Sequence, residues 1–270
     1  MPTALFVSPH LDDAAFSCGG TAARLSGLGW RVVLCTVFTA TVPNPRGFAL
    51  ACQTDKGVPA AEDYMALRRA EDEAAAAALG AEAIWLGHPE APHRGYESAR
   101  ELFAGAREED TVHEVVSRDL AALARSLSPA LIFAPQGLGG HVDHLQTIRA
   151  LKDALETDGT PSGLGPTPLY YRDTPYAIRE PESAPSLANL SSMVEVGVGI
   201  ESVLETKLRA CAFYCSQLDF QFGGREHMRE ALTRFASFED SRLKLGEPAE
   251  ACLCLESEAR ALRSMIGKLG

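Results

Sequence analysis

The chain has 270 residues, with 46% hydrophobic and 23% charged residues and a formal net charge of −11 at pH 7. These values are ordinary for a globular protein with a sizeable core, and the acidic balance argues against nucleic acid, whose phosphates need a basic face. No apolar run approaches the roughly 18 residues of a membrane span, and the N-terminus lacks the features of a signal peptide. We therefore expect a cytoplasmic protein without a membrane span.

Strand-like and helix-like segments alternate through the first two thirds of the chain. Apolar and β-branched runs predict strands, whereas helical spacing closed by glycine predicts helices. Strands are predicted at 3–8, 30–40, 83–87 and 130–135, and helices at 20–28, 62–80, 111–127 and 141–156. A long loop is predicted over 41–61, and a loop with a short helix over 88–110. This order predicts an α/β fold, a mostly parallel sheet with helices on both faces.

The pattern is weaker toward the C-terminus. Strands are predicted at 169–173, 192–198 and 251–256, helices at 201–218, 225–237 and 257–268, and a loop over 174–191. We expect a single domain in which residues 1–160 form the core and residues 161–270 complete it as a smaller α+β extension. Seven cysteines without framework spacing argue against disulfides in this fold. Cys211 and Cys215 are interpreted as one apolar helix face rather than a metal site.

Two polar clusters follow predicted strands. They consist of His10, Asp12 and Asp13 after the first strand, and His141, Asp143 and His144 after the fourth. Because the carboxyl ends of parallel strands share one edge of a sheet, we expect both clusters to meet there. Histidine and aspartate together suit a borderline divalent metal, zinc first, with iron, cobalt or manganese as alternatives.

The spacing within the clusters suggests different tasks. His141 and His144 are three residues apart at a helix start and can face the same way. The adjacent Asp12 and Asp13 point in different directions, so that one can bind metal while the other accepts a proton from the metal's water. Asp143 could orient a histidine. Singly, each cluster could be an ordinary loop or a capped helix start, but together they indicate a metal-dependent hydrolase.

The motifs HLDD (10–13) and HVDH (141–144), in this order, resemble the N-acetylglucosaminyl-phosphatidylinositol de-N-acetylases, also called the PIG-L or LmbE-like family. Weaker similarities include SCGGT (17–21), the helix LRRAEDEAAAAALG and the stretch 207–222. Leu11 and Val142 replace prolines of the family pattern, and Ala14 stands where many members have glutamate. These departures remove none of the candidate ligands.

The resemblance implies a Rossmann-like fold and a zinc-dependent N-deacetylase that acts on an N-acetylglucosamine-type conjugate. It implies that His10, Asp13 and His144 bind zinc, or another divalent metal such as Fe²⁺. Asp12 would then be the general base. His141 would stabilise the oxyanion or protonate the leaving amine, and Asp143 would tune a histidine. The resemblance also suggests a homo-oligomer.

Further residues are candidates for substrate contacts. Arg68 or Arg69 could bind a phosphate or a sugar hydroxyl, and His93 could line the cleft. Arg46, with the rest of the segment 41–61, could form a lid that contacts the substrate. Arg68 could instead pair with Glu71 or Asp72 at helical spacing. Two other functions remain open: hydrolysis of another bond such as a phosphoester, and sugar binding without catalysis. Both are less favoured, because the motifs contain no Lys or Arg and because Asp12 is present.

Overall fold

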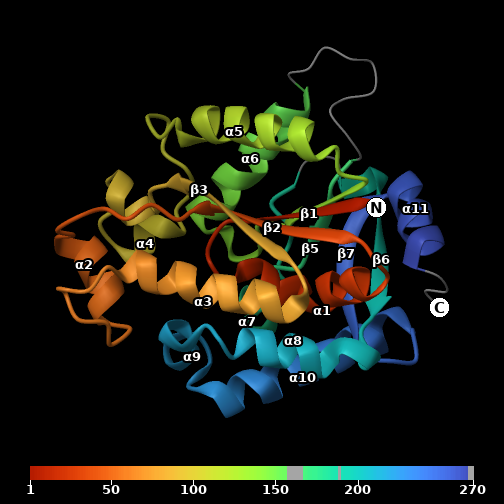
Figure 1. Ribbon diagram of the computed structural model, residues 1–270. Helices are drawn as coiled ribbons and strands as arrows, with labels where there is room; N and C mark the ends of the chain where they lie inside the picture. Colours follow the sequence, from red (N-terminus) through yellow and green to blue (C-terminus); the bar gives the residue numbers. More distant parts are fainter. Residues whose placement is uncertain (157–166, 188–189, 267–270) are drawn as a thin grey trace.

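The computed structural model describes residues 1–156, 167–187 and 190–266. Within them, seven strands form one sheet in the order β3-β2-β1-β4-β5-β7-β6 (Figure 1). The strands are β1 (Thr3–Ser8), β2 (Arg31–Phe38), β3 (Glu82–His88), β4 (Leu131–Pro135), β5 (Leu169–Tyr171), β6 (Met193–Gly199) and β7 (Ala249–Leu255). The first five are parallel, and β7 runs antiparallel to both β5 and β6. The prediction of a mostly parallel α/β sheet is confirmed.

The helices cover both faces of this sheet. The longer ones are α1 (Asp13–Gly27), α2 (Gly47–Thr54), α3 (Tyr64–Leu79), α5 (Val112–Leu127), α6 (Val142–Glu156), α8 (Leu204–Cys211), α9 (Cys215–Phe222), α10 (Arg225–Leu243) and α11 (Glu256–Ile266). Shorter turns are α4 (Ala99–Leu102), α7 (Tyr176–Arg179), η1 (Ala91–Arg94), η2 (Leu138–Gly140), η3 (Leu190–Ser192) and η4 (Glu201–Val203). Among the described residues, none of the helices is long and apolar enough to cross a membrane.

Strand β1 shows why the sheet is covered on both sides. Ala4 and Phe6 belong to the core shared with α1, α3, α8 and α10, whereas Leu5 and Val7 belong to the core shared with α5 and α6. Figure 1 shows α5 and α6 on one side of the sheet and α1, α3 and α8 on the other. Successive side chains of a strand point to opposite faces, so a central parallel strand must be apolar throughout. The strands β5, β7 and β6 extend this same sheet; the division at residue 160 stays a prediction.

Helix α1 starts seven residues before the predicted start at Gly20. The pair Gly19-Gly20 argues against a helix interior, but the chain bends at Cys18, whose φ is −139°. The bend frees the N–H groups of Gly20 and Thr21, which donate to the buried carboxylate of Glu250 at 2.9 and 2.7 Å. This acceptor comes from the distant strand β7, so local sequence patterns could not reveal it.

Other differences from the predictions are local. The loop predicted over 41–61 contains α2, and the loop predicted over 174–191 contains α7 and the first two residues of η3. The helix predicted over 201–218 is divided into η4, α8 and α9, so Cys211 and Cys215 do not share one helix face; Cys211 is buried and Cys215 is exposed. The cysteines of the chain are all free thiols, as predicted.

Candidate metal centre and active site

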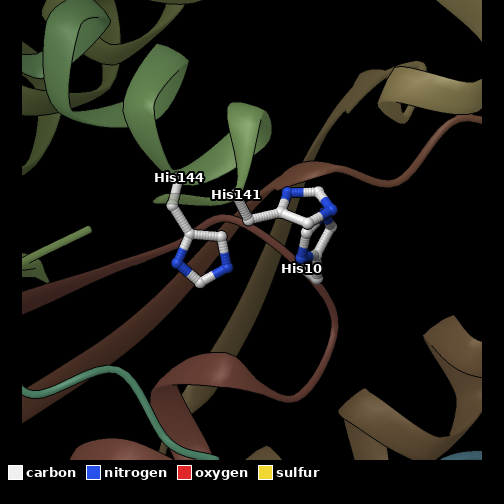
Figure 2. A group of neighbouring side chains, drawn as sticks. All are labelled: His10, His141 and His144. Carbon is white, nitrogen blue, oxygen red and sulfur yellow. The ribbon is translucent and has the colours of Figure 1, made fainter. Parts of the chain in front are cut away.

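The two polar clusters meet at the centre of the sheet edge. Strands β1 and β4 are adjacent and parallel, and the chain leaves β1 toward β2 on one side while β4 lies on the other. Ligands in open α/β sheets bind at such a reversal of strand order. His10 follows β1, and His141 and His144 flank the start of α6 (Figure 2). The predicted meeting of the two motifs is therefore what the structure shows.

The turn before α6 is packed closely against the site. Gly139 has a φ of +78°, and a Cβ there would lie 2.7 Å from the ring of Tyr176. Glycine is needed for two reasons: other residues rarely adopt this backbone conformation, and the Tyr176 ring leaves no room for a side chain. The Tyr176 ring in turn lies 5.5 Å from the His144 ring, between ring centroids.

Three imidazoles form a group that could hold a metal ion. Ring nitrogens of His10, His141 and His144 lie within 4.8 Å of one another. The carboxylate of Asp13 belongs to the same place, since its Oδ2 is 3.2 Å from both His10 Nδ1 and His144 Nε2. His144 Nε2 is buried and has no hydrogen-bond partner. An unsatisfied buried nitrogen beside a carboxylate and a second imidazole suits a divalent metal.

Two buried carboxylates orient two of these histidines. Asp143 Oδ2 lies 2.9 Å from His10 Nε2, and Asp173 Oδ1 lies 2.5 Å from His144 Nδ1. Both rings also face Asp13 through their second nitrogens, His10 Nδ1 and His144 Nε2. Burial would lower the pKa of both histidines, but the surrounding carboxylates raise the pKa of His10 well above its ordinary value and that of His144 to about 9. Asp143 and Asp173 hold protons on His10 Nε2 and His144 Nδ1, so a metal ion beside Asp13 would displace the protons of the opposite nitrogens.

His141 has the opposite arrangement. Its Nδ1 accepts a hydrogen bond from the backbone N–H of Asp143 at 3.2 Å, which places the ring proton on Nε2. Burial and the neighbouring His10 together lower the pKa of His141 to about 3. His141 is therefore a neutral imidazole with an Nε2–H donor.

Asp143 is held as an anion at the centre of this network. Burial would raise its pKa, but the hydrogen bond with His10 and the charge of Arg94 lower that pKa well below its ordinary value. Arg94 Nη1 lies 2.7 Å from Asp143 Oδ1, and the Ala91 backbone N–H donates to Oδ2 at 3.1 Å. Asp143 thus orients His10, whereas the sequence left open which histidine it would serve.

Asp12 lies beside the ligand group with a different partner. Burial raises the pKa of Asp12 to about 7, while the positive charge of Arg68 opposes the rise. Arg68 Nη2 is 3.5 Å from Asp12 Oδ1, and Arg68 Nη1 is 2.6 Å from Glu90 Oε1. Arg68 therefore pairs with Asp12 and Glu90, and the alternative of pairing with Glu71 or Asp72 is not found.

Sequence reasoning missed Asp173, Arg94 and Glu90. Asp173 follows β5, the next strand of the parallel sheet, at the same edge as the two motifs. The rule that found His10 and His141 would also have found Asp173, had the acidic end of the segment 169–173 been considered. Arg94 and Glu90 lie in the irregular segment after β3, for which no such rule exists.

A cavity of about 400 Å³ opens at this site. His10, Asp12, Asp13, His141 and Asp143 line it, together with Arg68. Helix α2, within the predicted loop 41–61, contributes part of the wall. Arg46 and His93 are not among the residues that line the cavity; Arg46 is exposed and His93 is half-buried on η1.

Residues 5–155 match the PIG-L family, described as GlcNAc-PI de-N-acetylase. The chain belongs to this family. A curated relative, 2'-N-acetylparomamine deacetylase of Streptomyces fradiae, is 33% identical over 232 residues, which are 84% of this chain and 77% of that protein.

Solved structures support the fold of this PIG-L family member. The zinc-inhibited form of teicoplanin deacetylase has a TM-score of 0.76 at 21% identity and covers 93% of this chain and 97% of that chain. The 4-carboxy-2-hydroxymuconate hydratase of Pseudomonas putida has a TM-score of 0.64 at 20% identity, over 94% of this chain and 97% of that chain. The second protein shows that the fold by itself does not determine the reaction.

Proposed function

We propose that this protein is a zinc-dependent N-deacetylase that removes an acetyl group from the amine of an N-acetylglucosamine-type conjugate. The observation that carries the proposal is the assignment of ring protons. Asp143 and Asp173 hold protons on His10 Nε2 and His144 Nδ1, so that His10 Nδ1 and His144 Nε2 face Asp13, where a metal ion could displace their protons. Asp12 and His141 lie next to them in states suited to proton transfer and hydrogen-bond donation. His10 Nδ1, Asp13 and His144 Nε2 are the proposed ligands.

A zinc ion at these ligands would supply Lewis-acid polarisation of the amide carbonyl and would lower the pKa of water. Asp12 is the proposed general base, because a carboxylate with a pKa near the working pH accepts a proton efficiently and can release it later. A cation beside it would lower that pKa from about 7.

His141 is proposed to stabilise the oxygen that becomes negative when the amide carbon is attacked. Its Nε2–H is a preformed donor, and a donor of this kind favours the transition state over the ground state when it is aimed at the developing charge. As a ligand, Nε2 would have to lose this proton, and Nδ1 would then have to give up the hydrogen bond from the Asp143 backbone. This makes His141 a poorer ligand than His10 or His144.

The substrate class rests on the relatives. The protein from Streptomyces fradiae is a deacetylase of 2'-N-acetylparomamine, and a neighbouring solved structure is a teicoplanin deacetylase. Both names describe removal of an acyl group from a larger natural product. An amino-sugar conjugate with a variable aglycone is the substrate that these two activities and the HLDD and HVDH motifs support together.

The test is acetate release from N-acetylglucosamine conjugates by protein loaded with one equivalent of Zn²⁺ or Fe²⁺ after chelator treatment. We expect no activity without metal and recovery with about one ion per chain. Because the solved teicoplanin deacetylase is a zinc-inhibited form, excess zinc is included as a separate arm. Hydrolysis of phosphoesters but not of acetamides, or binding of two ions per site, would contradict the proposal.

A further inference from the structure

The cavity continues beyond the ligand group into a part with aromatic walls. We call this part the vestibule and define it by Phe48, Leu102, Phe103, Tyr176 and Phe220, which all line the cavity. They come from four separate places in the chain: α2, the end of α4, α7 and α9. Phe103 is 47% exposed and Phe220 is 58% exposed, although water-exposed aromatic rings carry a free-energy cost.

The vestibule is continuous with the reacting centre. The Phe103 ring lies 5.3 Å from the His141 ring and 6.0 Å from the Tyr176 ring, between centroids. A substrate whose acetyl group lies at His141 would therefore extend along apolar walls as soon as it leaves the ligand group. Clustered exposed aromatic side chains that line a cavity mark a binding surface rather than an ordinary exterior.

Polar side chains around the vestibule already have partners. Gln217 Nε2 donates to the Tyr64 hydroxyl at 3.0 Å, and Arg179 Nη2 donates to Gln221 Oε1 at 2.9 Å. Lys56 Nζ donates to the Cys52 carbonyl at 2.9 Å and lies 4.9 Å from the centroid of the Phe220 ring. A ligand rich in hydroxyl groups would have to compete with these bonds, whereas an apolar ligand would leave them intact.

The inner carboxylates are also engaged. Asp12 and Glu90 face the Arg68 guanidinium, and Asp143 faces Arg94. Asp55, on the exposed segment after α2, is a neighbour of Lys56 in the chain. Apart from Asp55, the carboxylates that ammonium groups of a polycationic ligand would meet thus already face guanidinium groups or imidazoles, and basic side chains lie beside them, which reduces the electrostatic gain for such a ligand.

We propose that the vestibule binds a flat apolar aglycone, an aryl group in particular, attached to the amino sugar. This inference rests on the proposed function, because the acetyl group fixes the reacting end of the substrate at the ligand group and leaves the amine side to extend outward. The aryl group packs against Phe103 and Phe220 and removes their rings from water. The enzyme would accordingly favour aryl conjugates over polycationic amino-sugar compounds of similar size.

The test compares phenyl N-acetyl-β-glucosaminide with the methyl glycoside and with 2'-N-acetylparomamine. Affinity is measured by calorimetry on zinc-loaded Asp12→Asn protein, and kcat/KM is measured on the wild type. We expect the phenyl glycoside to bind at least about tenfold more tightly than either other compound, which corresponds to about 1.4 kcal/mol. Phe220→Ser should remove most of the phenyl-to-methyl ratio, and Phe238→Ser, a change at an exposed phenylalanine of α10 outside the cavity, should leave that ratio unchanged.

The outcomes separate this inference from the proposed function. Equal affinity for the phenyl and methyl glycosides, or tighter binding of 2'-N-acetylparomamine, would overturn the vestibule assignment even if all three compounds are deacetylated. N-octanoylglucosamine is measured as a fourth compound. If it binds more tightly than the methyl glycoside while the phenyl glycoside does not, the acyl side lies in the vestibule and the assignment is also overturned. Tight phenyl binding without any acetate release would support the vestibule and reject the deacetylase.

Discussion

Replacement of Asp173 by asparagine should weaken metal binding while the fold is kept. In the native protein, Oδ1 of Asp173 lies 2.5 Å from His144 Nδ1, and Oδ2 accepts from the backbone N–H groups of Gln136 and Leu138 at 2.9 and 3.1 Å. An asparagine has only one acceptor oxygen. If that oxygen faces the two backbone donors, the amide NH₂ faces His144 Nδ1, and the ring proton must move to Nε2.

The structure decides between the two orientations of this asparagine. Turning the NH₂ toward the two backbone N–H groups would leave the buried N–H of Leu138 unsatisfied, at about 1–3 kcal/mol, whereas the Gln136 N–H would keep its second acceptor, the Tyr171 carbonyl at 3.0 Å. The orientation that keeps the backbone bonds is therefore favoured, and it removes the lone pair of His144 Nε2. Loss of a carboxylate that orients a metal-bound histidine costs about 10–100-fold in metal affinity, and we expect an effect in this range for Asp173→Asn.

Zinc affinity is measured by competition with a chromogenic chelator, and stability by urea denaturation of the metal-free protein. Asp72→Asn is the matched control. Asp72 is buried like Asp173 and accepts from Trp85 Nε1 and the Tyr214 hydroxyl at 2.8 Å each, away from the histidines. We expect the control to lose stability but not zinc affinity. Zinc binding by Asp173→Asn within about twofold of the wild type would refute the argument that Asp173 sets the His144 tautomer.

Three further changes test other parts of the site. Asp12→Asn should keep the metal content of the wild type but lower acetate release by about 10²–10⁴-fold; full turnover would exclude Asp12 as the base. Arg94→Met leaves the buried charge of Asp143 without its 2.7 Å partner. The free energy of unfolding, measured with urea, should therefore fall by about 3–5 kcal/mol. An unchanged value would show that the contact with His10 is enough to stabilise the Asp143 charge. Cys215 is exposed, whereas Cys52 is half-buried and has a pKa raised by burial. A thiol reagent should therefore label Cys215 first in native protein, as checked by peptide mass analysis. Equal labelling of a buried cysteine would contradict the packing described.

Much of the site could be predicted because it depends on local sequence at strand ends. The apolar run before His10 and the run before His141 identify buried strands, and parallel strands bring their carboxyl ends to one edge. The sequence alone therefore indicated that HLDD and HVDH meet, and its resemblance to the PIG-L family separated the tasks of Asp12 and Asp13.

The prediction of elements was less complete where tertiary contacts override local preference. The bend inside α1 involves Glu250, which accepts from Gly20 and Thr21 across most of the length of the chain. A helix was not predicted over residues 47–54, because the flanking prolines and glycines are typical of a loop. The interruption between Cys211 and Cys215 likewise leaves no clear signal in the spacing of apolar residues.

The sequence by itself determined which residue types form the centre and along which edge of the sheet they lie. Only the tertiary structure decided which nitrogen of each histidine faces the candidate metal position, since that depends on the carboxylates of Asp143 and Asp173 and on one backbone N–H. It also decided that Arg68 faces Asp12 and that Phe103 and Phe220 line one cavity. Hydrogen-bond direction and the shape of a cavity arise from contacts between distant segments, and periodicity along a chain holds no record of them.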